Sequence, residues 1–204
     1  MRNYRTLNLI LKRSGDIVLA GLGTVLLSPL LLTIAAAIKA TSRGPVIFRQ
    51  MRLGKDGTEF AILKFRTMVQ NAEQIGDGLF VKTESDSRIT GVGKVLRATS
   101  LDELPQLLNV ISGNMSLVGP RPPVPHHPYR YEDYSEFQKK RFAMRPGITG
   151  LAQVTVRNAV PWDERIPLDV QYVETFNILL DAKILVRTVL KVFARESIYL
   201  TEKK

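Results

Sequence analysis

The sequence has no cysteine and only two histidines among its 204 residues. The lack of cysteine excludes disulfides, thiolate metal sites and cysteine nucleophiles, and it suits a reducing compartment. The two histidines, His126 and His127, are adjacent in the loop-like stretch VPHHPYRY, which offers no obvious third metal ligand nearby. A histidine-based zinc site or a Ser-His-Asp triad would depend on this one pair, so we interpret the pair as part of a solvated loop.

Acidic residues are also scarce: 19 Asp and Glu stand against 29 Lys and Arg, which gives a formal net charge of +10. Such a balance favours polyanionic partners, namely nucleic acid, anionic lipid headgroups or phosphorylated substrates. No helix-turn-helix, zinc-finger or RRM signature is present, so we expect no nucleic-acid partner. The length is enough for one domain with its own core and an accessory segment.

Charged residues are missing altogether from residues 17–38, a run that begins IVLAGLGTVLLSPLLLTIAAA. As a straight helix of about 1.5 Å per residue it would be about 33 Å long, enough to cross a hydrocarbon core of about 30 Å. It is longer than the apolar region of a signal peptide, and KATSRGP follows it in place of a small-residue cleavage site. A buried core helix is the alternative, although the run is apolar on every face.

Two features of this run favour a segment that enters and leaves the membrane by the same face. Ser28-Pro29 lies near its middle, where proline removes a helical hydrogen bond and bends the chain. Basic residues flank both ends, whereas a crossing segment has its positive residues mainly on the cytoplasmic side. We therefore predict a re-entrant helix within an N-terminal segment 1–40, with a spanning helix as the alternative. The flanking residues are Arg2, Arg5, Lys12 and Arg13 before the run and Lys39, Arg43, Arg49 and Arg52 after it.

The remaining residues, 41–204, have the pattern of a small α+β domain. Two β-rich runs surround Asp56-Gly57 in VIFRQMRLGKDGTEFAILKF, which is typical of a hairpin. Helical patterns follow, separated by Gly- and Pro-rich loops. We expect this domain to lie on the cytoplasmic face of the membrane. The predicted helices are 92–98, 102–112, 132–143, 162–176 and 181–196.

The last predicted helix carries basic residues at four-residue spacing beside an apolar stripe. Such a helix is suited to an anionic membrane surface. An ordinary amphipathic helix packed on the core would show the same pattern, so both interpretations stay open. The basic residues are Lys183, Arg187, Lys191 and Arg195.

Two adjacent carboxylates, Asp102 and Glu103, stand between arginines in LRATSLDELPQLLNVISGNMSLVGPRP. One interpretation is structural, because Ser100 and Glu103 have the spacing of a helix capping box and Pro105 suits a helix start. The other is a phosphate-handling site, in which arginines bind phosphate oxygens while carboxylates hold Mg²⁺ or supply a nucleophile. Spacing alone leaves both open.

Five motifs in order add a family resemblance. GPVIFRQMRLG, KFRTM, SLDELPQLLNV, GNMSLVGPRP and RPGITGLAQV together resemble the monotopic phosphoglycosyl transferases, the bacterial sugar transferases that begin glycan assembly on polyprenyl phosphate. The resemblance runs from Lys12-Arg13 through the Ser-Pro break to LDVQYVETFNILLDAKIL, so it covers nearly the whole chain. The length resembles the minimal form of the family.

The resemblance implies a reaction, its partners and a cofactor. Such enzymes transfer sugar-1-phosphate from a UDP-sugar to undecaprenyl phosphate at the cytoplasmic face of the bacterial inner membrane, and release UMP. In the family the aspartate of the acid pair attacks the phosphate next to the sugar. By position this is Asp102, which would form an aspartyl-phosphosugar intermediate. Glu103 would help Asp102 to hold Mg²⁺, the expected cofactor, or would assist proton transfer.

Other site residues are implied in the same way. Arg97 and Arg121 would bind phosphate, and Lys64 and Arg66 would line the same basic site. The expected nucleotide-sugar loop contains Arg145, Gly147, Thr149, Gln153 and Arg157. The expected membrane residues are Ser28 and Pro29 at the break and Lys12 and Arg13 at the headgroup level.

The chain departs from the family pattern after GLAQV, where a glycine usually precedes Arg-Asn and Val156 stands here. A β-branched residue rarely adopts positive φ, so we expect this loop to differ. No motif identifies the sugar or the oligomeric state.

Two rival functions remain. A non-catalytic basic module at a membrane or nucleic acid would bind with a steep salt dependence. A membrane phosphatase acting through Asp102 would release phosphate instead of UMP.

Overall fold

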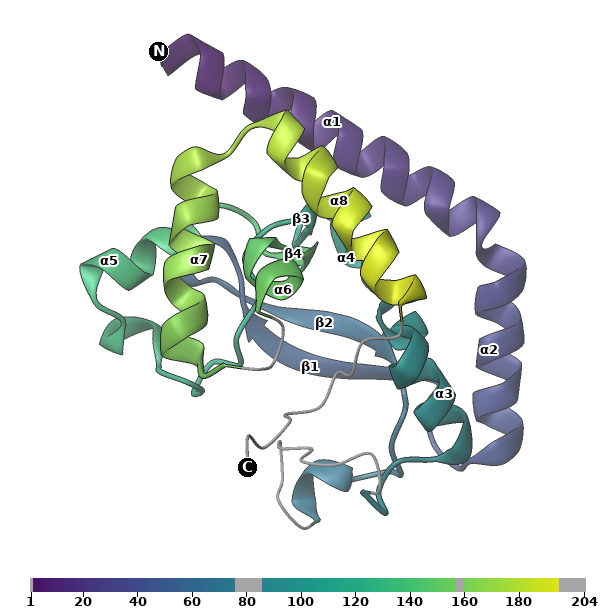
Figure 1. Cartoon of the computed structure of the whole chain (residues 1–204). Helices are drawn as coiled ribbons and strands as arrows, with labels where there is room; N and C mark the ends of the chain where they lie inside the picture. The colour runs from purple at the N-terminus through teal and green to yellow at the C-terminus, as the bar shows by residue number, and fades with distance from the viewer. Residues whose placement is uncertain (1, 76–85, 157–159, 195–204) are drawn as a thin grey trace.

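Two small two-stranded sheets are surrounded by helices in the computed structural model, which describes residues 2–75, 86–156 and 160–194 (Figure 1). The predicted α+β class is confirmed. The helices are α1 Arg2–Leu26, α2 Ser28–Thr41, α3 Gly91–Thr99, α4 Gln106–Ile111, α5 Glu136–Lys139, α6 Leu151–Thr155, α7 Trp162–Thr175 and α8 Ile178–Phe193. The strands are β1 Ile47–Leu53, β2 Glu59–Phe65, β3 Ser116–Val118 and β4 Gly147–Thr149.

The long apolar run is a bent pair of helices along one edge of the molecule (Figure 1). α1 and α2 meet at Leu27 with a bend of 61°. Pro29 stands in the first turn of α2, where its missing N–H leaves no helical hydrogen bond broken. The predicted break at Ser28-Pro29 is confirmed. Among the described helices none is by itself long and apolar enough for a membrane span, whereas Thr6–Leu26 and Ser28–Thr41 together meet those criteria.

The bent pair is not a buried core helix. Ala20 is fully buried where α1 packs on α4 and β3, but Leu22 and Leu26 are 55% and 75% exposed. On α2, Ile34 and Ile38 pack on Phe65, while Leu32 is 71% exposed. The alternative of an ordinary core helix is therefore wrong, and the pair presents an apolar outer surface.

The predicted hairpin is formed by β1 and β2, which pair antiparallel with Phe48 opposite Lys64. Asp56 (φ 54°) and Gly57 (φ 76°) form its turn, as an Asp-Gly pair favours. Phe60 and Ile62 point into the core with Val110 of α4 and Ala20 of α1. The hairpin thereby presents Lys64 close to the start of α4.

A second sheet was not predicted, because its strands have only three residues each. β3 and β4 pair parallel, with Ser116 opposite Gly147 and Val118 opposite Thr149. A Cβ at Gly147 would lie 2.1 Å from the backbone nitrogen of Gly119, so glycine is required for this close approach. The pairing brings the GNMSLVGPRP and RPGITG motifs side by side, although they are far apart in the sequence.

Three of the five predicted helices are confirmed as α3, α7 and α8. The predicted helix 102–112 is divided: a 3₁₀ turn at Leu101–Glu103 precedes α4, with Pro105 just before the helix. The predicted helix 132–143 is divided into two 3₁₀ turns and α5. α5 begins at Ser135, whose hydroxyl accepts a hydrogen bond from the Gln138 N–H in a capping box.

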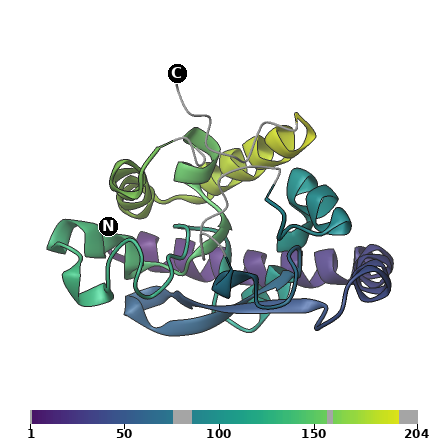
Figure 2. The same ribbon diagram turned by 90° about the horizontal axis from the view of Figure 1, so that it is seen from below.

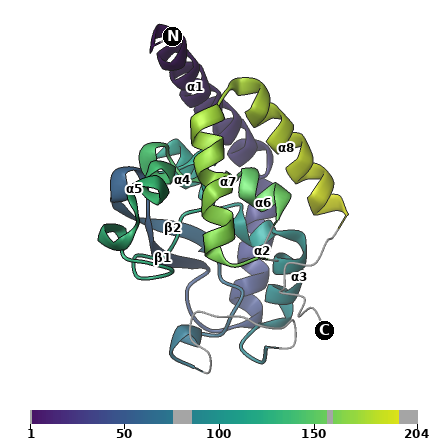
Figure 3. The same ribbon diagram turned by 60° about the vertical axis from the view of Figure 1, so that its left-hand side comes forward.

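α7 and α8 cover α6 and form the layer opposite the hairpin (Figures 2 and 3). On α8, Lys183 and Arg187 are exposed together with Leu179 and Leu190, while Ile184 packs on Tyr172 and Val118. One face of this helix thus packs on the core, as the second interpretation requires, while a role of the exposed face at a membrane surface stays a prediction. Arg195 lies outside the described residues.

A buried polar cluster joins α1 to α8. Lys12 Nζ lies 2.5 Å from Asp181 and 3.8 Å from Asp16. Asp181 also accepts a hydrogen bond from the Tyr172 hydroxyl, and Asp16 accepts one from the Ser116 hydroxyl. The Lys12 side chain is only 7% exposed, because these carboxylates enclose it.

Arg13 is also held by the protein. Its guanidinium donates to the backbone oxygens of Val110 and Ile111, at 2.8 and 3.3 Å, and so caps the C-terminal end of α4. The role expected for Lys12-Arg13 at the membrane headgroups is not supported by these contacts and stays a prediction.

Candidate active site

The acid pair lies in a sharp turn between α3 and α4. Ser100 adopts a left-handed backbone conformation (φ 56°), and the 3₁₀ turn Leu101–Glu103 follows it directly. The Ser100 side chain makes no capping hydrogen bond there. The capping-box interpretation of Ser100 and Glu103 is therefore wrong, and the Glu103 carboxylate is used elsewhere.

Glu103 forms an ion pair across the fold. Lys64 Nζ of β2 lies 2.6 Å from Glu103 Oε1, and the Arg121 guanidinium lies 4.0 Å from the same oxygen. Burial would raise the pKa of Glu103, but Lys64, Arg121 and Arg52 outweigh it and hold the pKa below its ordinary value. Glu103 is thus ionised at neutral pH, and its charge is balanced.

Asp102 has the opposite electrostatic character. Burial, together with the neighbouring charge of Glu103, raises the pKa of Asp102 to about 6, although Lys64 and Arg97 oppose the shift. The adjacent carboxylates therefore differ. Glu103 forms the ion pair with Lys64, and Asp102 has the higher pKa of the two. A carboxylate of raised basicity that is still ionised at neutral pH is suited to nucleophilic attack.

Two anchors position this turn against the hairpin. The Asn109 amide of α4 donates to the Ala61 carbonyl at 2.8 Å and accepts from the Leu63 N–H at 2.9 Å. Because both bonds go to the open edge of β2, they hold the start of α4 next to Lys64.

The predicted basic residues make different contacts in the structure. Arg97 Nε donates to the Thr67 hydroxyl at 2.9 Å, and its charge lowers the pKa of Asp102, so it lies at the site. Arg66 is 5% exposed, and its guanidinium donates to the Ser42 and Arg43 carbonyls after α2. Arg66 thus holds the loop between α2 and the hairpin, and it does not share the ion pairs by which Lys64 and Arg121 contact Glu103.

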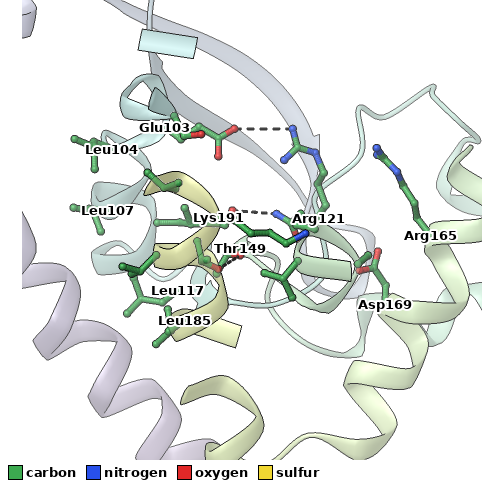
Figure 4. A pocket seen from close by; sticks show the side chains of 18 of the residues that line it. Glu103, Leu104, Leu107, Leu117, Arg121, Thr149, Arg165, Asp169, Leu185 and Lys191 are labelled. Carbon is green, nitrogen blue, oxygen red and sulfur yellow. Dashed lines mark hydrogen bonds and ion pairs between the residues drawn. The ribbon is translucent and has the colours of Figure 1, made fainter. Parts of the chain in front are cut away.

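A cavity of about 510 Å³ opens beside the acid pair, between α4, α6, α7 and α8 (Figure 4). Ser100 and Glu103, on either side of Asp102 in the sequence, line one end of it. Aliphatic side chains make most of the remaining wall, including Leu107, Leu117 and Leu185. Its size is that of a nucleotide-sized ligand site.

The polar end of this cavity holds Arg121 and two residues of α7, Arg165 and Asp169, with Trp162 at the start of the same helix. Asp169 is fully buried and pairs with Arg141 at 2.6 Å. Burial first, and then the charges of Arg121 and Arg141, lower the pKa of Arg165 to about 10, so it remains cationic at neutral pH.

The expected nucleotide-sugar loop is only partly at the cavity. Thr149 and Gln153 line it. Arg145 donates instead to the Gly113 carbonyl at 2.8 Å, and Gly147 is a buried strand residue in β4. Arg157 lies outside the described residues.

Residues 7–195 match the family model described as bacterial sugar transferase. The chain belongs to the bacterial sugar transferase family. This sugar transferase is 45% identical over 193 residues to the UDP-glucose:undecaprenyl-phosphate glucose-1-phosphate transferase of Caulobacter vibrioides, with 92% of this chain and 72% of the relative covered. It is 40% identical over 193 residues to the sugar transferase EpsL of Bacillus subtilis, with 95% and 92% covered.

Some relatives are much longer than this sugar transferase. It is 43% identical over 198 residues to the UDP-glucose:undecaprenyl-phosphate glucose-1-phosphate transferase of Klebsiella pneumoniae, with 95% of this chain covered. The match spans only 42% of the length of that relative. The two proteins thus share the region that contains the acid pair.

The acid pair of this sugar transferase fits a magnesium ion that is shared with a substrate. No group of three or more His, Asp or Glu side chains suited to a metal occurs in the described parts of the chain. Mg²⁺ in phosphoryl-transfer sites, however, is commonly held by one or two carboxylates and completed by substrate phosphates and water. Asp102, with its raised pKa, is the carboxylate whose ionised form such a cation would favour.

Sequence reasoning missed the contribution of α7 and α8 to the sugar transferase cavity. The predicted helix 162–176 includes Trp162, Arg165 and Asp169 without a role at the site. The basic stripe of the last helix includes Lys191 in the same way. One signal was available, since the sequence WDERIPLD places two ionised residues, Arg165 and Asp169, on one helical face beside Trp162.

Two loop expectations can also be compared with the structure. The His127 ring packs edge-on against Trp162, with 6.5 Å between ring centroids, so His127 is in part a packing residue. Val156 has φ −116°, which any L-residue adopts, so no positive φ is required at its position.

Proposed function

We propose that this sugar transferase transfers a sugar-1-phosphate from a UDP-sugar to undecaprenyl phosphate, with release of UMP. The observation that carries the proposal is the arrangement at the acid pair. The charges of Lys64 and Arg97 act on the Asp102 carboxylate, whose pKa is raised, and the adjacent Glu103 pairs with Lys64 and lies 4.0 Å from Arg121. The names of the Caulobacter and Klebsiella relatives describe, for those proteins, the transfer of glucose-1-phosphate from UDP-glucose to undecaprenyl phosphate. The apolar bent helix pair suits a lipid acceptor.

In the first half-reaction an Asp102 oxygen attacks the phosphate that carries the sugar. A bond forms between that oxygen and phosphorus while the bond to the bridging oxygen breaks, and UMP leaves with the electron pair. An aspartyl-phosphosugar remains on the enzyme. Arg97 and Arg121 neutralise the charge on the transferred group, and positioning with charge neutralisation is the main catalytic requirement of phosphoryl transfer.

In the second half-reaction an oxygen of the acceptor phosphate attacks the same phosphorus. The bond to Asp102 breaks, and the carboxylate is regenerated as the polyprenyl-diphosphate sugar forms. A covalent relay suits this pair of substrates, since the diphosphate donor and the phosphate acceptor do not have to occupy the site at the same time. When bound, Mg²⁺ would add positive charge at the phosphates.

We place the enzyme at the cytoplasmic face of the bacterial inner membrane, as a monotopic protein that catalyses the first membrane step of glycan assembly. The 61° bend at Leu27 supports a re-entrant segment, because it redirects α2 away from the axis of α1. The exposed apolar residues of α1, α2 and α8 would face lipid.

The test is an intact-mass experiment with a panel of UDP-sugars and Mg²⁺ but no acceptor. The wild-type enzyme should release at most about one equivalent of UMP and gain the mass of one phosphosugar, the burst expected of covalent catalysis. Undecaprenyl phosphate should then discharge the adduct. Asp102→Asn should show neither burst nor adduct, whereas Asp133→Asn, an exposed acid outside the site, should behave as wild type.

The alternatives give different results. A fully active Asp102→Asn enzyme would falsify the covalent mechanism, and release of inorganic phosphate in place of UMP would favour the phosphatase. A non-catalytic module would release neither product. The panel also identifies the sugar, because only the correct donor gives a rapid burst.

A further inference from the structure

Positive charge exceeds negative charge at the polar end of the cavity. Asp169 is already compensated by Arg141, and Glu103 by Lys64, both at 2.6 Å. Arg121 and Arg165 add two further cations at this end in the part of the chain that the structure describes, and each is close enough to influence the pKa of Asp169. A low-dielectric site with such an excess is suited to an anionic ligand.

Arg165 is held in a fixed place at this end. It is only 8% exposed, yet it lines the cavity. Its guanidinium carbon lies 5.3 Å from the Trp162 ring centroid, and that of Arg141 lies at the same distance from the same ring. Stacking on an aromatic ring orients a guanidinium, and the planar fork of an oriented guanidinium matches the geometry of a phosphate or carboxylate.

Arg121 joins this end to the acid pair. In Figure 4 the guanidinium groups of Arg121 and Arg165 extend toward the same end of the cavity as Glu103. A donor with two phosphates one bridging oxygen apart would therefore place its attacked phosphate at Asp102 and its other phosphate at Arg165, with Arg121 between them.

We propose that Arg165 and Arg121 form a phosphate subsite that is used twice in each turnover, first by the phosphate of the departing UMP and then by the phosphate of the lipid acceptor. This inference rests on the proposed function. Displacement at phosphorus is in line, so UMP leaves on the side opposite Asp102. The acceptor must then attack opposite Asp102, which is the side that UMP has vacated. One anion subsite consequently serves both half-reactions.

The chain contains its own reporter for this subsite, because Trp162 is its only tryptophan. Full-length enzyme in detergent is titrated with UMP, uridine and farnesyl phosphate, a short polyprenyl phosphate, while tryptophan fluorescence is followed. We expect a saturable change with UMP, binding of uridine at least about tenfold weaker, and competitive displacement of UMP by farnesyl phosphate. Simultaneous binding of UMP and farnesyl phosphate would overturn the shared subsite.

Variants then assign the subsite to Arg165. Arg165→Gln should weaken UMP binding at least about tenfold and slow both adduct formation and adduct discharge, while Arg130→Gln, an exposed arginine in a distant part of the sequence, should do neither. A loss confined to one half-reaction, or unchanged UMP binding, overturns the proposal. If Arg165→Gln does not fold, Arg165→Lys provides the same test. It should weaken UMP binding but not uridine binding, because lysine keeps the charge without the planar fork. Equal weakening of both ligands would overturn the assignment.

The fluorescence result is independent of turnover. If no UDP-sugar yields UMP but UMP still competes with farnesyl phosphate at Trp162, the proposed function fails while the anion subsite stands. If the enzyme turns over normally and UMP causes no saturable change in wild-type fluorescence, the subsite is overturned and the proposed function stands.

Discussion

Adjacent residues in the acid pair acquire different chemistry from their surroundings. Asp102 and Glu103 have similar side chains and share one turn, yet only Glu103 lies within ion-pair distance of Lys64. Burial acts on both, but Lys64 and Arg121 outweigh it at Glu103 and lower that pKa, whereas burial, with the charge of Glu103, raises the pKa of Asp102 to about 6. Two carboxylates with separated pKa values can take separate roles, one electrostatic and one nucleophilic.

The pH dependence of the reaction should report Asp102. In the proposed mechanism only the ionised form of Asp102 attacks, so kcat/KM for the UDP-sugar should fall about tenfold per pH unit below about 6. Glu103→Gln should move this midpoint to lower pH, because the negative charge of Glu103 raises the pKa of Asp102 and its removal also frees Lys64. A pH–rate profile of both enzymes checks the prediction, and an unmoved or raised midpoint in Glu103→Gln would contradict it.

The arginines at the acid pair should matter for turnover more than for folding. Arg97→Ala and Arg121→Ala should each lower kcat/KM by about 100-fold or more, through loss of charge-assisted hydrogen bonds to phosphate. Lysine at either position should rescue only in part, because it cannot form a two-pronged contact. Steady-state UMP release measures the effect, with Arg130→Ala as the exposed control; full activity in an alanine variant removes that arginine from the site.

At the scale of elements, a single proline divides the apolar run. The backbone carbonyl of Leu27 still accepts from the Leu31 N–H, and the Ser28 hydroxyl donates to the Val25 carbonyl at 2.7 Å. These bonds satisfy backbone groups at the bend, which is a requirement for any break within a membrane.

Replacement of Pro29 should change the topology of this segment. In the wild type, single cysteines at Leu7 and Arg43 of this cysteine-free chain should label from the cytoplasm alone, because both flanks are basic. Pro29→Leu supplies the N–H and removes the ring clash that exclude one continuous helix through position 29, and it should place the two cysteines on opposite sides in a measurable fraction of molecules. Labelling of intact cells with a membrane-impermeant thiol reagent gives the result, and periplasmic labelling of the Leu7 cysteine in the wild type would exclude a re-entrant segment.

Short elements also bring the motif loops together. β3 and β4 contribute only two register pairs, but these pairs align the loop of Arg121 with the loop of Thr149 and Gln153 at one cavity. Gly119 and Gly147 permit this approach because neither has a side chain at the crossing.

At the scale of the whole molecule, the bent helix pair is tied to the elements that enclose the cavity. Lys12 connects α1 with Asp181 of α8, and Asp181 in turn accepts from Tyr172 of α7. α7 and α8 form two walls of the cavity. The helix pair is therefore joined by buried polar contacts to the elements that enclose the site.

Removal of the Lys12 ammonium should be costly for the whole fold. Lys12→Met leaves the Asp16 and Asp181 carboxylates buried without their cation, and breaking a buried pair costs about 3 kcal/mol or more. Lys140→Met breaks a pair of similar length, 2.7 Å, that is about half exposed, and should cost less than about 1 kcal/mol. Denaturant unfolding in detergent measures both, and equal costs would mean that the Lys12 cluster contributes no more than a surface pair.

The features that the sequence determined by itself are local in origin. Pro29 removes a backbone donor wherever it stands in a helix, Asp56-Gly57 favours a tight turn, and the order of the motifs placed the chain in its family. A phosphate-binding role for Arg66 stays a prediction, and its proximity to Lys64 in the sequence does not reveal that its guanidinium donates to the Ser42 carbonyl. The pairing of Lys64 with Glu103, and the position of Arg165 at the same cavity as Arg121, were decided only by tertiary structure. Such contacts depend on how elements distant in the sequence pack together. A local sequence pattern therefore does not show which of several cations will pair with a buried carboxylate.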